Sequence, residues 1–344
     1  CALRLGEAHL QFMLSSKKIA RRVSEGRSGD SYALEAGIVP LQGGHTIAEN
    51  QKRVAMQFGV FYQLPCAPGQ SVPTRYQETL EQIVLADEVG FDSAWLAEAH
   101  FDPGFSTMPA PLVVAAALSG RTRRIRLGIG VSQLPLHNPV SVAEEAATVD
   151  IVTGGRLDLG IGRGTWDHNF KGFGIPWEER TTRLEEAVDI LEQAWSDKPL
   201  SYQGQHYQFD SINIVPNPLQ QPGPPLHIAA NSPSTAEFAG QRGLRLLMAA
   251  PIHPWPDNFL THLALYRDSA AKHASKNTYV SGLFFAFTAL DRVAVRMQMA
   301  DSFARHPIGQ NTSYETAEEK MAIFGNPQEC IDRIAEIQQR AKLD

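Results

Sequence analysis

The clearest pattern of hydrophobic and polar positions along the chain predicts a helix over residues 178–195. Its apolar side chains recur at intervals of three and four residues, at Leu184, Ala187, Val188, Leu191 and Ala194. Acidic residues fill the opposite face, at Glu185, Glu186, Asp189 and Glu192. One apolar stripe and one charged face are typical of a helix that packs on a core and meets water on its outer side.

Short apolar runs alternate with helical patterns from residue 57 onward and predict parallel strands. Seven strands are expected, at residues 57–62, 92–97, 125–131, 157–161, 226–230, 245–249 and 280–288. A helical pattern follows each strand, and this repeat predicts the α/β class and a (β/α)8 TIM barrel. The chain ends after a helix that begins at Asn326, where an eighth strand would be expected. The prediction is therefore a barrel that lacks its last strand and helix.

A doubly wound open sheet is the alternative architecture. A nucleotide-binding sheet of that kind carries a glycine-rich turn after its first strand. Here the first strand is followed by Gln63, Leu64, Pro65 and Cys66, which do not fit that pattern. The barrel is therefore preferred.

Three segments depart from the alternation of strands and helices. Residues 1–55 are basic with little periodicity, and we expect a poorly structured extension in front of a barrel domain at residues 56–344. Residues 200–225 predict a hairpin and a proline-rich connection inserted on the barrel. Residues 306–324 have no clean period and predict a mobile loop.

Composition argues against several classes of function. The chain has 344 residues, of which 43% are apolar and 20% charged, with a net charge of −6. These values are typical of a globular protein and unfavourable for a nucleic-acid partner. No apolar run is long enough to cross a bilayer. No cluster of His and Asp has metal-ligand spacing, so no metal site is predicted, and three scattered cysteines favour the reducing cytoplasm.

Two side chains that can move protons follow the strand at residues 92–97. Side chains alternate along a strand, so Glu98 and His100 are expected on the same face, at the mouth of the barrel. A carboxylate beside an imidazole can transfer protons or hydrogen-bond a polar ring. The spacing is also compatible with a structural Glu–His pair.

A phosphate site is predicted where the fourth and fifth strands end. Arg163 lies between two glycines, which places a fixed positive charge on a backbone that a ligand can approach closely. Ser232 is expected to cap the next helix, with Thr235 in its first turn, where free N–H groups and hydroxyls bind phosphate. The alternatives are a solvated surface turn and simple helix capping.

Several segments, in this order along the chain, resemble the bacterial luciferase-like flavin-dependent monooxygenases. They are residues 95–101, 134–140, 155–164, 231–235 and 325–330. The resemblance covers residues 56–344 and implies an oxidoreductase barrel that binds reduced FMN, delivered by a separate flavin reductase. It implies that reduced FMN and O2 form a peroxyflavin, which attacks a small-molecule organic substrate. A homodimer is left open.

The resemblance also implies roles for individual residues. It places Arg163, Ser232 and Thr235 at the FMN phosphate. Asn231 occupies a position where the luciferases have a glutamate. Gly130–Val131 matches the place of a non-proline cis peptide against the flavin ring, and the segment after the seventh strand resembles a mobile lid.

One departure from the family pattern concerns the base. The luciferases have Glu-His-His-Phe after the second strand, and the first His is tied to catalysis, whereas this chain has Ala99 there. We therefore expect His100 to make the polar contact with flavin or substrate, oriented by Glu98. Two alternatives stay open: a deazaflavin-dependent oxidoreductase of the same superfamily, which transfers hydride, and a flavin-binding protein without turnover.

Overall fold

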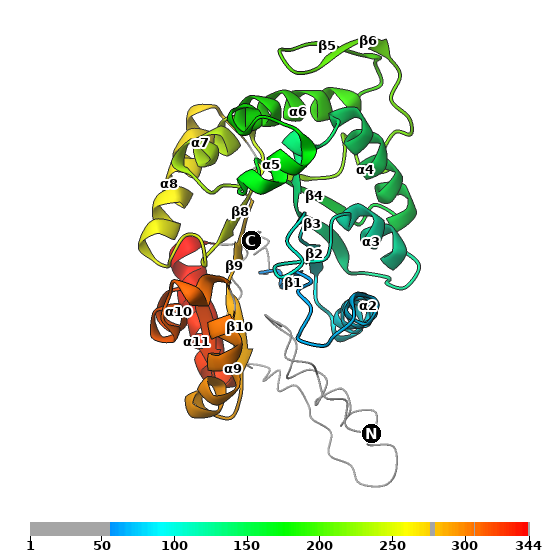
Figure 1. The fold of residues 1–344 in the computed structure, drawn as a ribbon. Coiled ribbons are helices and arrows are strands. Elements are labelled where there is room, and N and C mark those ends of the chain that lie inside the picture. The colour runs from blue at the N-terminus through cyan, green and yellow to red at the C-terminus, as the bar shows by residue number, and fades with distance from the viewer. Residues whose placement is uncertain (1–55, 276–278, 306, 343–344) are drawn as a thin grey trace, which may run out of the picture.

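A parallel sheet of seven strands forms the centre of the molecule (Figure 1). The computed structural model describes residues 56–275, 279–305 and 307–342. The strands follow one another in the sheet in chain order, as β1 (Gly59–Tyr62), β2 (Ser93–Leu96), β3 (Arg126–Gln133), β4 (Leu157–Gly162), β7 (Leu226–Ala229), β8 (Arg245–Ala249) and β9 (Val280–Leu283). This arrangement confirms the predicted α/β class and the order of the seven strands.

Helices follow the strands and cover the outside of the sheet (Figure 1). They are α2 (Val72–Val89), α3 (Pro111–Leu118), α4 (Pro139–Thr153), α5 (Asp167–Phe173), α6 (Arg180–Ala194), α7 (Pro233–Arg242) and α8 (Asp257–Lys272). Gly90, Gly154 and Gly243 end three of them in the left-handed conformation, which costs glycine no steric clash. The stripe predicted on α6 is buried as expected, at Leu184, Ala187, Val188, Leu191 and Ala194.

The predicted seven-stranded barrel is confirmed, and the structure adds one short strand, β11 (Ala322–Gly325), before the helix predicted at Asn326. The strand expected at residues 280–288 divides at Phe284 into β9 and β10 (Phe285–Thr288), and β10 pairs in parallel with β11. Helix α11 (Pro327–Ala341) follows β11. The pattern missed β11 because its four residues are all buried and so show no alternation. Within the described residues β11 pairs with β10 and not with β1, so the barrel is nearly closed.

The segment between β10 and β11 begins with the helix expected after the seventh strand, and helices also form within the loop predicted at residues 306–324. It contains α9 (Arg292–Arg305), the short 3-10 helix η3 (Pro307–Gln310) and α10 (Tyr314–Lys320), while residue 306 lies outside the described part. A small second core holds it against β10 and β11, and includes Phe285, Phe287, Phe303, Tyr314 and Phe324. The aromatic residues of this core come from four elements, so no local periodicity in the sequence could predict that they pack together. A lid movement of this segment stays a prediction.

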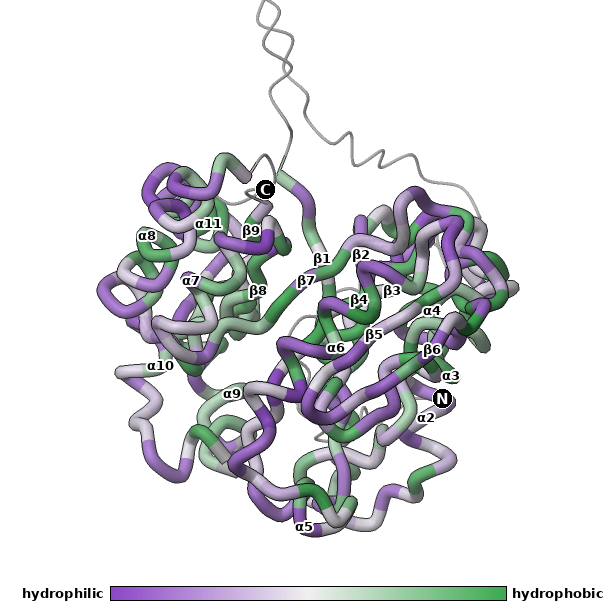
Figure 2. Tube along the Cα trace, turned by 90° about the horizontal axis from the view of Figure 1, so that it is seen from above, coloured by the Kyte–Doolittle hydropathy of each residue, from purple (hydrophilic) through white to green (hydrophobic). Residues whose placement is uncertain are grey.

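The predicted hairpin insertion is confirmed. Strands β5 (Leu200–Gln203) and β6 (Gln208–Ile212) pair antiparallel beside the barrel (Figure 1). Two more 3-10 helices, η1 (Leu134–Leu136) and η2 (Trp177–Glu179), lie in the loops after β3 and β4. Seen from above, the central strands carry hydrophobic stretches, whereas the elements around them alternate between hydrophobic and hydrophilic stretches (Figure 2).

Two further sequence predictions concern membrane-spanning segments and the extension at residues 1–55. No helix in the described part of the chain is both long and apolar enough to span a membrane. The extension predicted at residues 1–55 lies outside the described residues. The division into an extension and a barrel domain therefore stays a prediction.

Candidate active site

A cavity of ≈ 1220 Å³ runs through the barrel and is lined by residues at both the N-terminal and the C-terminal ends of the strands. At the C-terminal ends of the strands it is lined by Glu98 after β2, Gln133 at the end of β3 and Arg163 after β4. At the N-terminal ends it is lined by Arg126 of β3 and Arg245 of β8. Ligands of β/α barrels bind at the C-terminal ends, where the loops after the strands converge. The volume is large enough for a cofactor together with a small organic molecule.

Five of the six residues predicted to contact the cofactor line this cavity. They are Gly130, Val131, Arg163, Asn231 and Thr235. The peptide bond between Gly130 and Val131 is cis, as the resemblance implies. The strands β3, β4 and β7 therefore bring together residues that are up to 105 positions apart, which is the difference between 235 and 130.

Ser232, the sixth residue, acts as the cap of α7. Its Oγ accepts a hydrogen bond from the Thr235 N–H at 3.3 Å and lies 2.9 Å from the Thr235 Oγ1. Ser232 is not among the residues that line the cavity. The capping alternative therefore describes its observed contacts, while Thr235 is the hydroxyl that reaches the cavity. A contact of Ser232 with a phosphate stays a prediction.

Arg163 provides positive charge without a carboxylate to neutralise it. Within the described residues no Asp or Glu forms an ion pair with it. Its Nη1 donates a long hydrogen bond of 3.5 Å to Thr181 Oγ1. Burial lowers the pKa of the Arg163 guanidinium, and the nearby charge of Arg180 lowers it further. An anion bound here would relieve both effects, so the site fits a phosphate group.

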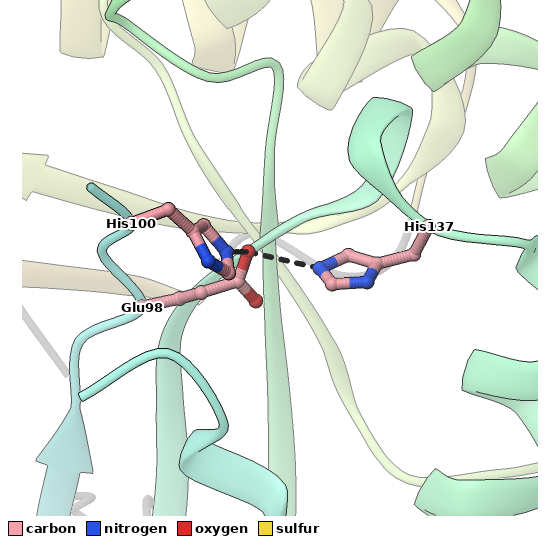
Figure 3. A group of neighbouring side chains, drawn as sticks. All are labelled: Glu98, His100 and His137. Carbon is pink, nitrogen blue, oxygen red and sulfur yellow. Dashed lines mark hydrogen bonds and ion pairs between the residues drawn. The ribbon is translucent and has the colours of Figure 1, made fainter. Parts of the chain in front are cut away.

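Glu98 is the meeting point of three hydrogen bonds beside the cavity. Its Oε1 accepts from His100 Nε2 at 3.0 Å and from His137 Nε2 at 2.9 Å (Figure 3). The backbone N–H of Gln133 donates to the same oxygen at 3.2 Å. Glu98 reaches this position from the loop after β2, and His137 comes from the loop after η1. The carboxylate thus ties two neighbouring barrel loops together.

These contacts set the charge states of Glu98 and His137. Burial alone would raise the pKa of the Glu98 carboxyl, but the hydrogen bonds from His100 and His137 outweigh burial and lower it. Burial alone would lower the pKa of His137, but its hydrogen bond to Glu98 and the negative charges of Glu98 and Glu145 raise it. The arrangement therefore favours an ionised carboxylate beside a protonated imidazole.

His100 and Glu98 point to the same side, as predicted, but only Glu98 lines the cavity. The His100 ring is 8% exposed and packs against Phe173, with ring centroids 4.9 Å apart. Regular alternation does not apply, because β2 ends at Leu96 and Phe101 has a φ of 58°. His100 therefore contacts the carboxylate, and Glu98 is the group that faces the cavity.

His137 is the member of this group that sequence analysis did not assign to the site. It lies 39 positions from Glu98, and sequence analysis included it only within the segment 134–140 that carries the family resemblance. Glu98, His100 and His137 each offer one atom within 4.8 Å of the others, a set that could also hold a divalent cation. The three short hydrogen bonds account for the geometry without one, and no described residue orients the Nδ1 atoms as metal-bound imidazoles require.

Comparison with known proteins identifies the family. The family model described as luciferase-like monooxygenase matches residues 56–342. The chain belongs to this family. The resemblance seen in the sequence motifs is therefore confirmed.

Relatives of the chain within the luciferase-like monooxygenase family include enzymes with described activities. The oxygenase component of a flavin-dependent trigonelline monooxygenase from Acinetobacter baylyi is 32% identical over 201 residues, which are 58% of this chain and 55% of the relative. The alkanal monooxygenase alpha chain of the Kryptophanaron alfredi symbiont is 29% identical, over 69% of this chain and 65% of the relative. The chain matches little more than half the length of the first of these curated relatives.

A solved structure supports the fold. The crystal structure of a monooxygenase from Streptomyces bottropensis matches with a TM-score of 0.76 and 27% identity, over 84% of this chain and 90% of that chain.

In this chain, Ala99 occupies the position where the resemblance implies a catalytic histidine. Ala99 is 2% exposed and donates its N–H to the Met108 carbonyl. The family's first histidine is thus replaced by a buried residue without a proton to give.

Proposed function

We propose that this chain is the oxygenase of a monooxygenase reaction that uses reduced FMN and O2 on an organic substrate. The observation that carries the proposal is the convergence of Val131, Arg163, Asn231 and Thr235 on one cavity at the C-terminal ends of β3, β4 and β7. Reduced FMN supplies two electrons, so that one atom of O2 enters the substrate and the other leaves as water. Family membership supports the same reaction class.

The chain's own residues would bind the cofactor through its phosphate. Arg163 would neutralise the phosphate charge, and the Thr235 hydroxyl at the start of α7 would donate a hydrogen bond to it. The edge of Gly130–Val131 would face the flavin ring, because both residues line the cavity and their strand, β3, lies next to β4 in the sheet. Asn231 would contribute an amide in place of a carboxylate, which avoids repulsion between a carboxylate and the phosphate.

The residues near the cavity mouth would exclude water and orient the substrate. Phe105 and Trp166 line the cavity and pack edge to face, with ring centroids 4.4 Å apart. We assign the polar contact with the cavity contents to Glu98, because Glu98 lines the cavity and His100 does not. His100 would then orient Glu98, which reverses the roles expected from the sequence.

The proposal also includes a separate flavin reductase as a partner and a cytoplasmic location. One relative is described as an oxygenase component, which supports supply of reduced flavin by a separate reductase. A cytoplasmic location is proposed because Cys66 and Cys330 are free thiols, as is common in a reducing compartment. A homodimer stays a prediction.

A screen of cofactors and their reaction with O2 tests the function. The protein is expected to bind reduced FMN and to change the rate at which bound flavin is reoxidised by O2, relative to free reduced FMN. Binding of a reduced deazaflavin in preference to FMN would favour the hydride-transferring alternative. Binding of FMN with reoxidation at the rate of free flavin would favour a flavin-binding protein without turnover.

A further inference from the structure

The two oxygens of the Glu98 carboxylate have different surroundings. Oε1 receives all three hydrogen bonds, from His100, His137 and the Gln133 N–H. Within the described residues Oε2 has no hydrogen-bond partner, and it is turned away from both imidazole rings (Figure 3). The side chain is only 3% exposed and lines the cavity. Oε2 is therefore an acceptor that a ligand in the cavity can reach.

A ligand that displaces water from this oxygen without donating a hydrogen bond to it loses binding free energy. The oxygen can therefore distinguish ligands that carry a donor from those that do not. A buried carboxylate oxygen that loses water without gaining a donor is destabilised, and a hydrogen bond to a charged acceptor is stronger than a neutral one. The walls of the same cavity include apolar side chains such as Phe105, Trp166 and Ile252. A site of this kind discriminates strongly against analogues that lack the matching donor.

We propose that Glu98 Oε2 selects substrates that carry a hydroxyl or N–H donor on an apolar body, and that His137 is the positioning residue that keeps this oxygen available. The inference rests on the proposed function, because it assumes that the cavity takes an organic substrate. His137 binds Oε1 and leaves Oε2 to the ligand. His100 holds the same oxygen from the other loop.

His137 also makes the site sensitive to solvent protons. Its side chain is 29% exposed, whereas the His100 ring is 8% exposed. The groups around His137 are Glu98, His100 with ring centroids 6.2 Å apart, Glu145, and Tyr207, whose hydroxyl donates to the His137 carbonyl. Removing His137 takes one stabilising donor from the Glu98 carboxylate, so Glu98 should then take up a proton at a higher pH.

Two flat probes that differ in one donor test the proposal on flavin-free protein. The dissociation constants of 2-naphthol and 2-methoxynaphthalene are measured by fluorescence. The wild-type protein should prefer the naphthol by about tenfold or more, as expected for a hydrogen bond to a charged group. In Glu98→Gln the preference should fall to within a few-fold. No preference in the wild type, or full preference in Glu98→Gln, overturns the proposal.

The pH at which the preference is lost tests the role of His137. In His137→Ala the loss should occur at a higher pH than in the wild type, and His137→Gln, which keeps an N–H donor, should lie between them. The control is His206→Ala, which removes an imidazole beside Glu179 outside the cavity and should leave the pH profile unchanged. Equal profiles for His137→Ala, His137→Gln and wild type contradict the positioning role. Because no flavin or O2 is used, failure here leaves the monooxygenase proposal standing, and failure of flavin binding leaves this result interpretable.

Discussion

At the scale of single residues, the site depends on a carboxylate that two histidines from different loops hold in place. The pairing of Glu98 with His100 was predictable, because the two residues are two positions apart. The contact with His137 was not, because it depends on how the loops after β2 and η1 approach each other in the folded barrel. Spacing in sequence identifies such pairs only when both residues lie in the same short segment of the chain.

Replacement of Glu98 by Gln is expected to reduce stability in a pH-dependent way. The Glu98 pKa is lowered from 4.5, so its contribution is present above that value and is lost as pH falls through the lowered pKa. The His137 pKa is raised from 6.5, so its contribution is present below that value and is lost as pH rises through the raised pKa. Between these limits the wild type should exceed the variant by about 1–3 kcal/mol in free energy of unfolding.

Urea unfolding at several pH values measures this difference. The difference between wild type and Glu98→Gln should be largest between the lowered pKa of Glu98 and the raised pKa of His137, and it should shrink as the pH rises through the latter. A difference that does not change with pH would show that the lost contact is one of packing and not of charge.

At the scale of elements, local signals located helices better than short buried strands. Asn326, Pro327 and Glu329 predicted the start of α11, and the capping box is present. The strand just before it was missed, because β11 is four residues long and buried throughout. A cap is formed by neighbours in sequence, whereas a buried strand is defined by the sheet that it joins.

The cap of α11 provides a test at this scale. Asn326 Oδ1 accepts from the Glu329 N–H at 3.0 Å, and Glu329 Oε2 accepts from the Asn326 N–H at 2.8 Å. Asn326→Ala should cost about 1 kcal/mol in free energy of unfolding, whereas Asn326→Gly should cost only a few tenths. Chemical denaturation of both variants checks this, and equal losses would argue against the cap as the source of stability.

At the scale of the whole molecule, the repeat of strand and helix predicted the barrel, and the order of motifs predicted the family. What the sequence could not provide is the shape of the cavity, because its walls come from elements spread over the chain, such as Phe61 in β1 and Ile323 in β11. The second small core around Phe303 and Tyr314 was missed for the same reason. Local periodicity was therefore enough to predict the fold class, whereas the shape of the site depends on contacts between residues that are far apart in the sequence.

The central claim is that this cavity holds a flavin through its phosphate, and Arg163 tests it most directly. The dissociation constants of FMN and riboflavin are compared in wild type, in Arg163→Ala and in the control Arg183→Ala, whose guanidinium pairs with Glu179 outside the cavity. Loss of a charge-assisted hydrogen bond of roughly 1.5–3 kcal/mol predicts FMN binding about tenfold to a hundredfold weaker in Arg163→Ala. Riboflavin binding should change little, and Arg183→Ala should bind both as the wild type does. Equal losses for FMN and riboflavin in Arg163→Ala, or no loss for either, would contradict the account.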